Sequence, residues 1–298
     1  MKPNHKIAGI GEILWDMFPG EGRLGGAPSN FACHCHQLGS DAFPVSCVGD
    51  DELGLQTQKE LERLGVSSEF VEQNPDYPTG RVQVSLDEAG KPSYEILDDM
   101  AWDHLEFTPE MQALAETLDA ACFGILSQRS PGSRNTIQRF LRAMPEDSLR
   151  IFDVNLRGHF YSIQQVEVSL RIATILKLSD EELPILADYF DLSGSVTDQL
   201  AKLREKFELD LVAYTRGRAG SLLIGEREIN ESVGLEVTAR DSVGAGDSFT
   251  AALCTGLLKG MRLSEVNAFA NRVASFVCSQ KGACPKLPDS LKWQKVGP

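Results

Sequence analysis

An acidic residue follows three small residues at a point where the sequence predicts the start of a helix. The stretch DSVGAGDSFTAALCTGLL spans residues 241–258, and after Asp247 its apolar residues recur at helical spacing. Gly244, Ala245 and Gly246 leave the approach to this helix unobstructed. Their backbone N–H groups, together with the positive end of the helix dipole, therefore predict an anion hole.

Asp247 fits either of two roles in this motif. Its carboxylate could accept a proton from an attacking hydroxyl while the anion hole stabilises a transferring phosphoryl group. Its pKa need not be raised for this, because a loose phosphoryl-transfer transition state requires little early proton removal. The alternative is that Asp247 only complements the helix dipole, an interaction of about 0.3–1 kcal/mol. The motif by itself leaves both roles open.

A glycine pattern in the segment GEGRLG, residues 20–25, has the spacing of a dinucleotide-binding fingerprint. That fingerprint needs its first glycine directly after a strand and its third inside a helix. Here Pro19 comes first, and the next helix is predicted to start only at Pro28. We interpret the segment as a turn in a small β lid. A phosphate-binding P-loop is excluded, because no GxxxxGK[ST] occurs.

The segment CHCH, residues 33–36, contains residue types that bind metals. On a helix only Cys33 and His36 share a face, and a structural zinc site needs four ligands. We therefore expect core packing of the cysteines and an exposed histidine. The seven cysteines of the chain lack CxxC spacing, which favours reduced core thiols over a disulfide framework.

Composition limits the partners and the location of the protein. A chain of 298 residues, 42% of them hydrophobic, can bury a large core, and we expect one main domain. The net charge of -14 disfavours nucleic acid and anionic membranes as partners. The chain start does not resemble a signal peptide, and no run of eighteen apolar residues follows. The expected location is the cytoplasm.

Apolar runs bounded by turn residues alternate with helical patterns along most of the chain. This alternation predicts a mostly parallel sheet covered by helices on both faces, with ligands beyond the carboxyl ends of the strands. The segment TGRVQVSLDEAGKPSYEIL breaks the pattern and predicts an antiparallel hairpin. We expect a single domain over residues 1–298, with a β lid formed by inserted segments at about 12–26 and 78–104.

Several segments together resemble the PfkB, or ribokinase-like, family of sugar kinases. DSVGAGDSFTAAL resembles the C-terminal signature of the family, and GGAPSNFACHCHQLG resembles its glycine-rich sugar-binding segment. Between them, DVNLR, KLSDEE and YTRGRAGSLL resemble further family segments in the same order, and ANRVASFVCSQKGACP resembles the closing helix and loop. The resemblance implies an α/β fold of ribokinase type, with three α/β/α layers, a mostly parallel central sheet and a small β-sheet lid.

The resemblance also implies roles for individual residues. Asp247 would be the base that activates the sugar hydroxyl, and Gly244, Ala245 and Gly246 would form the hole for the γ-phosphate. Arg157 would present its guanidinium fork to phosphate or substrate, the alternative being a surface arginine. The residues implied for sugar binding are Asp16, Gly25, Gly26, Asn30 and Gln128. The residues implied for ATP binding are Ser179, Glu182, Thr215, Arg216, Gly217, Gly220 and Asn271.

Two ion sites follow from the same resemblance. Glu182 would organise Mg²⁺ through water, which suits a hard cation that keeps part of its hydration shell. Ser179 departs from the family, because asparagine is usual there, and this shortens the expected phosphate contact. A monovalent cation such as K⁺ would bind near Asp241 and the QKGA loop, although a loop without an ion fits the sequence about as well.

The lid sequence resembles that of bacterial fructokinases in its Pro-Thr-Gly, Gly-x-Pro-x-Tyr and Ala-Trp-Asp elements. The expected reaction is the phosphorylation of fructose to fructose 6-phosphate by ATP. Ribose, 2-keto-3-deoxygluconate and tagatose remain alternatives, because one or two pocket side chains can change the preference. A sugar-binding regulator without turnover is a further alternative, with Ser179 as its one supporting feature. A β lid often pairs with a second copy, so a homodimer is also expected.

Overall fold

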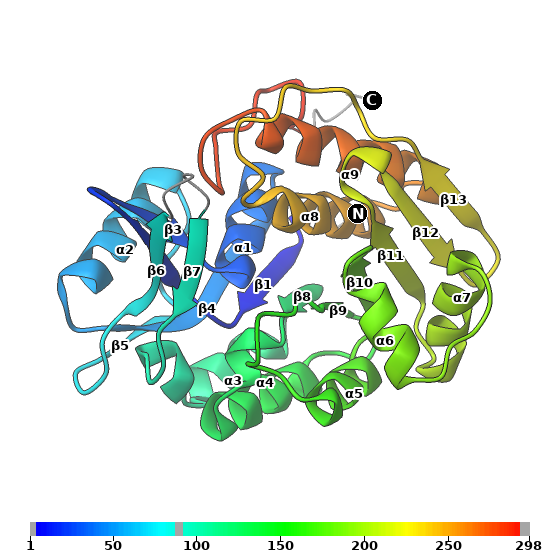
Figure 1. The fold of residues 1–298 in the computed structure, drawn as a ribbon. Coiled ribbons are helices and arrows are strands. Elements are labelled where there is room, and N and C mark those ends of the chain that lie inside the picture. The colour runs from blue at the N-terminus through cyan, green and yellow to red at the C-terminus, as the bar shows by residue number, and fades with distance from the viewer. Residues whose placement is uncertain (1–3, 87–91, 293–298) are drawn as a thin grey trace.

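The computed structural model describes residues 4–86 and 92–292, and a nine-stranded sheet forms its centre (Figure 1). The strand order is β13-β12-β11-β10-β9-β8-β1-β4-β5. The strands of this sheet are β1 (Lys6–Ile10), β4 (Asp41–Gly49), β5 (Val71–Asn74), β8 (Ala120–Phe123), β9 (Leu149–Asp153), β10 (Ile175–Ser179), β11 (Leu211–Thr215), β12 (Ser221–Gly225) and β13 (Ile229–Ser232).

Every neighbouring pair from β5 to β11 is parallel, and only the pairs β11–β12 and β12–β13, at one edge, are antiparallel. The parallel strands are short apolar runs, and four of the five residues of β1 are buried. Strands of this kind need cover on both faces, because parallel sheets rarely expose a face to water. The predicted mostly parallel sheet is confirmed.

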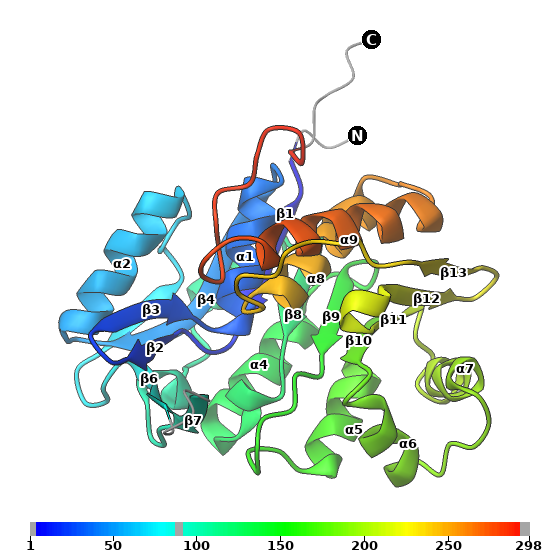
Figure 2. The same ribbon diagram turned by 45° about the horizontal axis from the view of Figure 1, so that its top comes forward.

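Helices cover both faces of the central sheet (Figures 1 and 2). Each face has its own hydrophobic core, which gives the three-layer α/β/α arrangement predicted from the resemblance. One face carries α1 (Ala27–Gln37), α8 (Ala245–Leu258) and α9 (Leu263–Cys278). The other face carries α3 (Pro109–Ala115), α4 (Pro131–Ala143), α5 (Ile163–Ile172), α6 (Leu183–Tyr189) and α7 (Val196–Lys206). The remaining α-helix in the described residues is α2 (Glu52–Leu64).

A separate four-stranded sheet forms the lid, in the order β3-β2-β6-β7. Its strands are β2 (Leu14–Phe18), β3 (Glu21–Gly25), β6 (Gly80–Leu86) and β7 (Pro92–Ile96). Strands β6 and β7 pair antiparallel as predicted, and the turn between them, residues 87–91, lies outside the described residues. The glycine pattern at 20–25 forms the β2–β3 turn and strand β3, so it opens no helix. The side chain of Trp15 fastens the lid to α2 by donating to the Thr57 hydroxyl at 2.9 Å.

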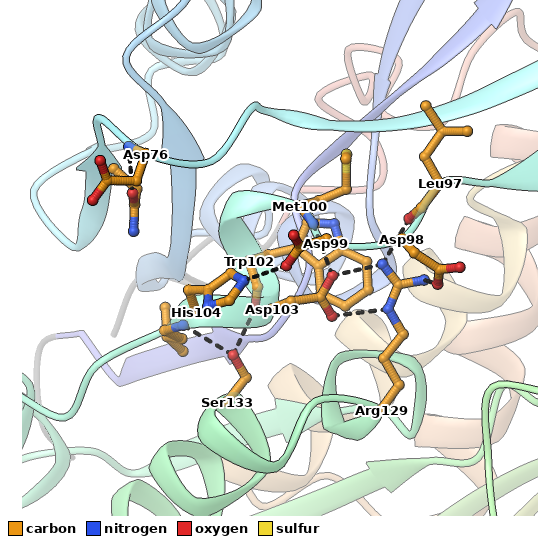
Figure 3. Close-up of polar contacts among 12 residues, drawn as sticks. Asp76, Leu97, Asp98, Asp99, Met100, Trp102, Asp103, His104, Arg129 and Ser133 are labelled. Atoms are coloured by element: carbon orange, nitrogen blue, oxygen red, sulfur yellow. Dashed lines mark hydrogen bonds and ion pairs between the residues drawn. The ribbon is translucent and has the colours of Figure 1, made fainter.

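The guanidinium of Arg129 binds the segment that leads from the lid back to the core (Figure 3). Nε and Nη2 of Arg129, just before α4, donate to the two carboxylate oxygens of Asp103 at 2.8 and 2.6 Å. Nη2 also donates to the carbonyl oxygen of Leu97, directly after β7, and the guanidinium lies 4.1 Å over the ring of Trp102. A bidentate pair of this kind fixes direction as well as distance. Arg129 therefore anchors the base of the lid to the core.

We predict that Arg129→Met destabilises the fold by about 3–5 kcal/mol, because it leaves a buried carboxylate without its partner. The Asp103 side chain is only 5% exposed. The measurement is the free energy of unfolding in urea. Arg171→Met is the matched control, because Arg171 is 62% exposed in its pair with Glu167 and its loss should cost less than about 1 kcal/mol. Equal effects of the two substitutions would contradict the prediction.

No helix within residues 4–86 and 92–292 combines the length and apolar character that crossing a membrane requires. The seven cysteines all lie in the described residues as free thiols, and five of them are buried: Cys33, Cys35, Cys47, Cys122 and Cys254. The prediction that cysteines pack in the core is confirmed for these five.

Candidate active site

Asp247 lies in the first turn of α8. The helix begins at Ala245, and Gly244 precedes it in the left-handed region with φ 79°. Ala245 and Gly246 therefore belong to the helix, whereas the sequence pattern indicated an approach before it. The first N–H groups of a helix have no partner within the helix, so this first turn offers donors for an anion. Asp247 is half-buried beside them.

The backbone of Gly244 passes so close to another backbone segment that a side chain would not fit at this position. A Cβ atom at this position would lie 2.2 Å from the carbonyl oxygen of Ala283, in the loop after α9. The same carbonyl oxygen accepts a hydrogen bond of 2.9 Å from Nε2 of His34 on α1. The loop after α9 is thus held between α1 and the start of α8.

His34 is fully buried, so the expectation of an exposed histidine in the CHCH segment is wrong for this residue. Burial lowers the pKa of His34 to about 4, which keeps the ring neutral. Because a carbonyl can only accept, the proton of the neutral ring is carried by Nε2. The neighbouring Cys33 and Cys35 are buried as predicted. No group of three or more His, Cys, Asp or Glu side chains in residues 4–86 and 92–292 could hold a metal ion.

The predicted sugar-binding segment meets Asp247 directly. Gly26 has φ 106°, and a Cβ atom there would lie 2.3 Å from the carbonyl oxygen of Glu12. Helix α1 starts at the next residue and carries Asn30 in its first turns. Nδ2 of Asn30 donates to Oδ2 of Asp247 at 2.8 Å, across 217 residues of sequence. The structure therefore brings the two signature segments together at one point.

Asp16 lies in the middle of lid strand β2. Burial raises the pKa of Asp16 to about 6, against the opposing effects of Arg23 and Arg157. Arg23 is the residue directly opposite Asp16 in β3. A Cβ atom at Gly25 would lie 3.0 Å from Oδ2 of Asp16, so these two predicted sugar-binding residues are neighbours.

The pKa of Asp247 is raised to about 6. Burial is the main cause, and the negative charge of Asp153 adds to it. The hydrogen bond from Asn30 and the positive charges of Lys177 and Arg157 oppose the rise. A carboxylate with a pKa near 6 is still ionised at neutral pH and is a stronger base than an ordinary aspartate.

Arg157 is exposed, and its Nη1 donates only to the neighbouring Leu156 carbonyl, at 3.1 Å, among the described contacts. Its charge nevertheless acts on both Asp16 and Asp247, whose pKa values it lowers. Asn155, in the same DVNLR segment, has φ 43° and so occupies the left-handed region that is uncommon for residues other than glycine. Arg157 is therefore near enough for its charge to act on both acids.

Glu182 is buried and firmly held. Oε1 accepts from the backbone N–H of Leu156 at 2.9 Å, and Oε2 accepts from the N–H and the hydroxyl of Ser179 at 2.7 and 3.0 Å. Both oxygens are thus fixed by protein donors, which suits contact with a metal through water better than direct ligation. The Ser179 hydroxyl is directed to Glu182, in contrast to its predicted contact with phosphate.

The predicted nucleotide loop follows β11. Thr215 Oγ1 lies 3.4 Å from the Leu178 carbonyl oxygen, and Arg216 pairs with Glu231 at 2.8 Å. Gly217 and Gly220 have positive φ values of 51° and 89°. A Cβ atom at Gly220 would lie 2.0 Å from a backbone oxygen of the strand β13. The loop is therefore a tight backbone turn at the end of the sheet.

Two predicted binding residues use their amide groups inside the protein. Gln128 is fully buried, and Nε2 donates to the Gly124 carbonyl and the Ser169 hydroxyl, both at 2.9 Å. Nδ2 of Asn271 donates to the Ser221 hydroxyl at 2.6 Å. Buried amides usually have partners, and here the protein supplies them for both amide nitrogens, whereas Oε1 of Gln128 is buried without one in the described structure. Both amide nitrogens thus have protein partners, and the two predicted binding roles stay predictions.

Asp241 is held by three donors. Oδ1 accepts from the N–H of Val243 at 3.1 Å, and Oδ2 accepts from the N–H of Gly282 at 3.1 Å. Nη1 of Arg23, from the lid, lies 3.4 Å from Oδ2. The lid thus places a guanidinium where the sequence led us to expect a monovalent cation.

The chain matches the profile of the pfkB family carbohydrate kinases over residues 20–290. It belongs to the pfkB family. An uncharacterized sugar kinase of the archaeon Pyrococcus horikoshii, PH1459, is 31% identical over 97% of this chain and 96% of its own length. A fructokinase of Escherichia coli is 26% identical over 95% of this chain and 96% of its own length.

The crystal structure of PH1459 in complex with ATP has a TM-score of 0.79 to this chain at 30% identity, covering 93% of this chain and 94% of that chain. The predicted ribokinase-like fold is thereby confirmed. The chain is a sugar kinase of the pfkB family, and the sequence resemblance that led to this conclusion is borne out.

Two polar residues near the site were missed by the sequence analysis. Glu12 follows β1, is 2% exposed and accepts at Oε1 from the N–H of Ala27 at 3.3 Å, and burial raises its pKa to about 7. Lys177 lies inside the buried strand β10. The available signal was a charged residue within or directly after an apolar run, in KIAGIGEIL and ATILKLS. Such residues are rarely buried without a partner or a task.

We predict that Gly244→Ala lowers the kcat of the kinase by roughly a hundredfold, the scale of losing an anion-hole donor. The added methyl group would push the first turn of α8 away from the Ala283 carbonyl oxygen. Gly260→Ala is the matched control, because Gly260 has a similar φ of 68° and no atom within 4 Å of the added Cβ. Both variants should lose about 1–2 kcal/mol of stability from the left-handed backbone, Gly244→Ala should lose further stability through the contact with Ala283, and only Gly244→Ala should lose activity. Equal kcat values for the two variants would refute the prediction.

Proposed function

We propose that the chain catalyses the transfer of the γ-phosphoryl group of ATP to fructose, giving fructose 6-phosphate. The hydrogen bond between Asn30 and Asp247 carries the proposal, because it joins the predicted sugar segment to the predicted base at a helix N-terminus. The fructokinase names among the relatives support fructose, and the ATP-bound relative supports ATP. We further propose that the chain acts as a single cytoplasmic kinase domain with the β lid as an insertion.

In the proposed reaction Asp247 takes the proton of the attacking sugar hydroxyl. The oxygen of that hydroxyl forms a bond to the γ-phosphorus while the bond to the ADP oxygen breaks. The first turn of α8 donates N–H groups to the transferring phosphoryl group, which carries the negative charge in the transition state. Asn30 fixes the Asp247 carboxylate in one orientation. Asp16 and the lid would hold the other hydroxyls and keep water out.

Glu182 would hold Mg²⁺ through water, since three protein donors already fix its carboxylate. When bound, Mg²⁺ neutralises charge on the phosphate oxygens of ATP. A monovalent cation beside Asp241 stays a prediction. Arg23 already supplies a positive charge to that carboxylate, which favours activity without added K⁺. Dimer formation through the lid also stays a prediction, which the molar mass in solution would decide.

The substrate is tested by ADP release with Mg·ATP against fructose, ribose, 2-keto-3-deoxygluconate, tagatose and adenosine, each with and without K⁺. We expect the highest kcat/KM for fructose, with phosphate on O6, because the lid carries fructokinase-like elements. A preference for another sugar would support the proposed kinase activity but would contradict fructose as the substrate. If the protein binds sugar but turns over none of the five compounds, the result would contradict the proposed kinase activity and favour a sugar-binding regulator.

We predict that kcat falls as the pH drops through about 6, because the base must be ionised and Asp247 has a pKa of about 6. Asp247→Asn should lose at least roughly a hundredfold in kcat at pH 8. The same variant should be more stable than the wild type at pH 8 and equally stable at pH 4. The reason is that a folded-state pKa above the unfolded value adds stability at low pH, and this contribution is lost as the pH rises through about 6.

Urea unfolding of both proteins at pH 4 and pH 8 measures this difference. A variant that loses activity together with stability at pH 8 would point to a damaged fold and would speak against Asp247 as the base.

A further inference from the structure

A buried ion pair lies beneath the candidate anion hole. Nζ of Lys177 is 2.9 Å from Oδ1 of Asp153, and the two side chains are 9% and 6% exposed. The two residues are direct partners in the register of the parallel strands β9 and β10. Removing both charges from water is costly, and an apolar pair of similar volume is often at least as stable. Stability alone therefore does not account for this pair.

The pair contacts the first turn of α8 at two points. The hydroxyl of Thr250, one turn into the helix, lies 3.2 Å from Oδ2 of Asp153 and 2.9 Å from the carbonyl oxygen of Gly246. A Cβ atom at Gly246 would lie 3.1 Å from Nζ of Lys177. The ammonium group thus lies close to Gly246, in the same first turn of α8 as Asp247.

The groups around Lys177 are mostly acidic. The charged or titratable groups that face it are Asp153 from β9, Glu182 before α6, Asp247 from α8 and the Cys122 thiol from β8. Burial disfavours the charged ammonium, but the carboxylates of Asp153 and Glu182 outweigh this and raise the pKa of Lys177. Lys177 therefore remains positive. Burial raises the pKa of the Cys122 thiol, which stays neutral.

We propose that Lys177 and Asp153 form a positioning pair for phosphoryl transfer, in which the ammonium holds the first turn of α8 and keeps the neighbouring Asp247 carboxylate charged. The proposal rests on the proposed role of Asp247 as base. The two partners act on that carboxylate in opposite directions, since the negative charge of Asp153 raises its pKa and the positive charge of Lys177 lowers it.

The test is the pH dependence of kcat in Lys177→Met and Asp153→Asn, measured on the sugar that the wild type prefers. Lys177→Met should move the acid limb of the profile to higher pH by roughly one unit, and Asp153→Asn should move it to lower pH. The KM for sugar should change less than kcat at pH 7 in Lys177→Met, because the hydrogen bond described for Lys177 goes to Asp153 and not to the predicted sugar segment. General loosening of the site would not shift the two profiles in opposite directions.

The titration of Asp247 is also followed by carboxyl NMR, with Asp247→Asn to assign the signal. This readout needs no turnover, so it remains informative if the wild type phosphorylates no sugar and the proposed function fails. Opposite shifts of the Asp247 titration in the two variants support the positioning pair. An unchanged titration in folded Lys177→Met, or shifts in the same direction in both variants, would overturn it. If Lys177→Met does not fold, Asp153→Asn alone decides by the direction of its shift.

Discussion

The site depends on the meeting of two helix N-termini. Helices α1 and α8 pack side by side on one face of the sheet (Figure 1), and the hydrogen bond from Asn30 to Asp247 joins their first turns. Each helix follows a glycine with positive φ, Gly26 and Gly244, that passes within van der Waals distance of another backbone segment. The positive ends of two helix dipoles therefore point toward the same place, where a transferring phosphoryl group would be stabilised. A side chain at either glycine would separate the helices from their neighbours.

The lid and the sugar segment belong to one continuous stretch of chain. Along the chain, strands β2 and β3 come after β1 and before α1. The position of the lid is therefore linked directly to the start of α1. Trp15 fastens this part of the lid to α2, and Arg129 fastens the returning end to the core. Because both ends of the lid are attached, Asp16 stays beside Gly25, the residue that precedes Gly26. This arrangement places the acid of a lid strand beside the segment that leads into α1.

Local patterns predicted the parts of the site that depend on local structure. The helix that carries Asp247 in its first turn, the strand pattern and the lid hairpin follow from residues that are neighbours in sequence, and the order of motifs identified the family. The protein partners of the Gln128 and Asn271 amides could not be predicted, because they are set by tertiary packing, which brings Ser169 and Ser221 against them. For the same reason, the burial of His34 was not expected and Lys177 was missed. Their partners, Ala283 and Asp153, are known only once the elements are packed.

The distribution of charge around the site follows from its chemistry. A hydroxyl group is activated by a carboxylate, but ATP brings further negative charge, so a site built from acids alone would repel its own substrate. In this chain the acids are matched by cations from other elements. Lys177 pairs with Asp153 beneath the helix turn, and Arg23 from the lid lies opposite Asp16 and pairs with Asp241. Arg23 belongs to the lid and Asp241 lies just before the candidate anion hole, so this contact joins the lid to the site by opposite charges. The lid therefore brings a positive charge to the site in a chain whose net charge is -14.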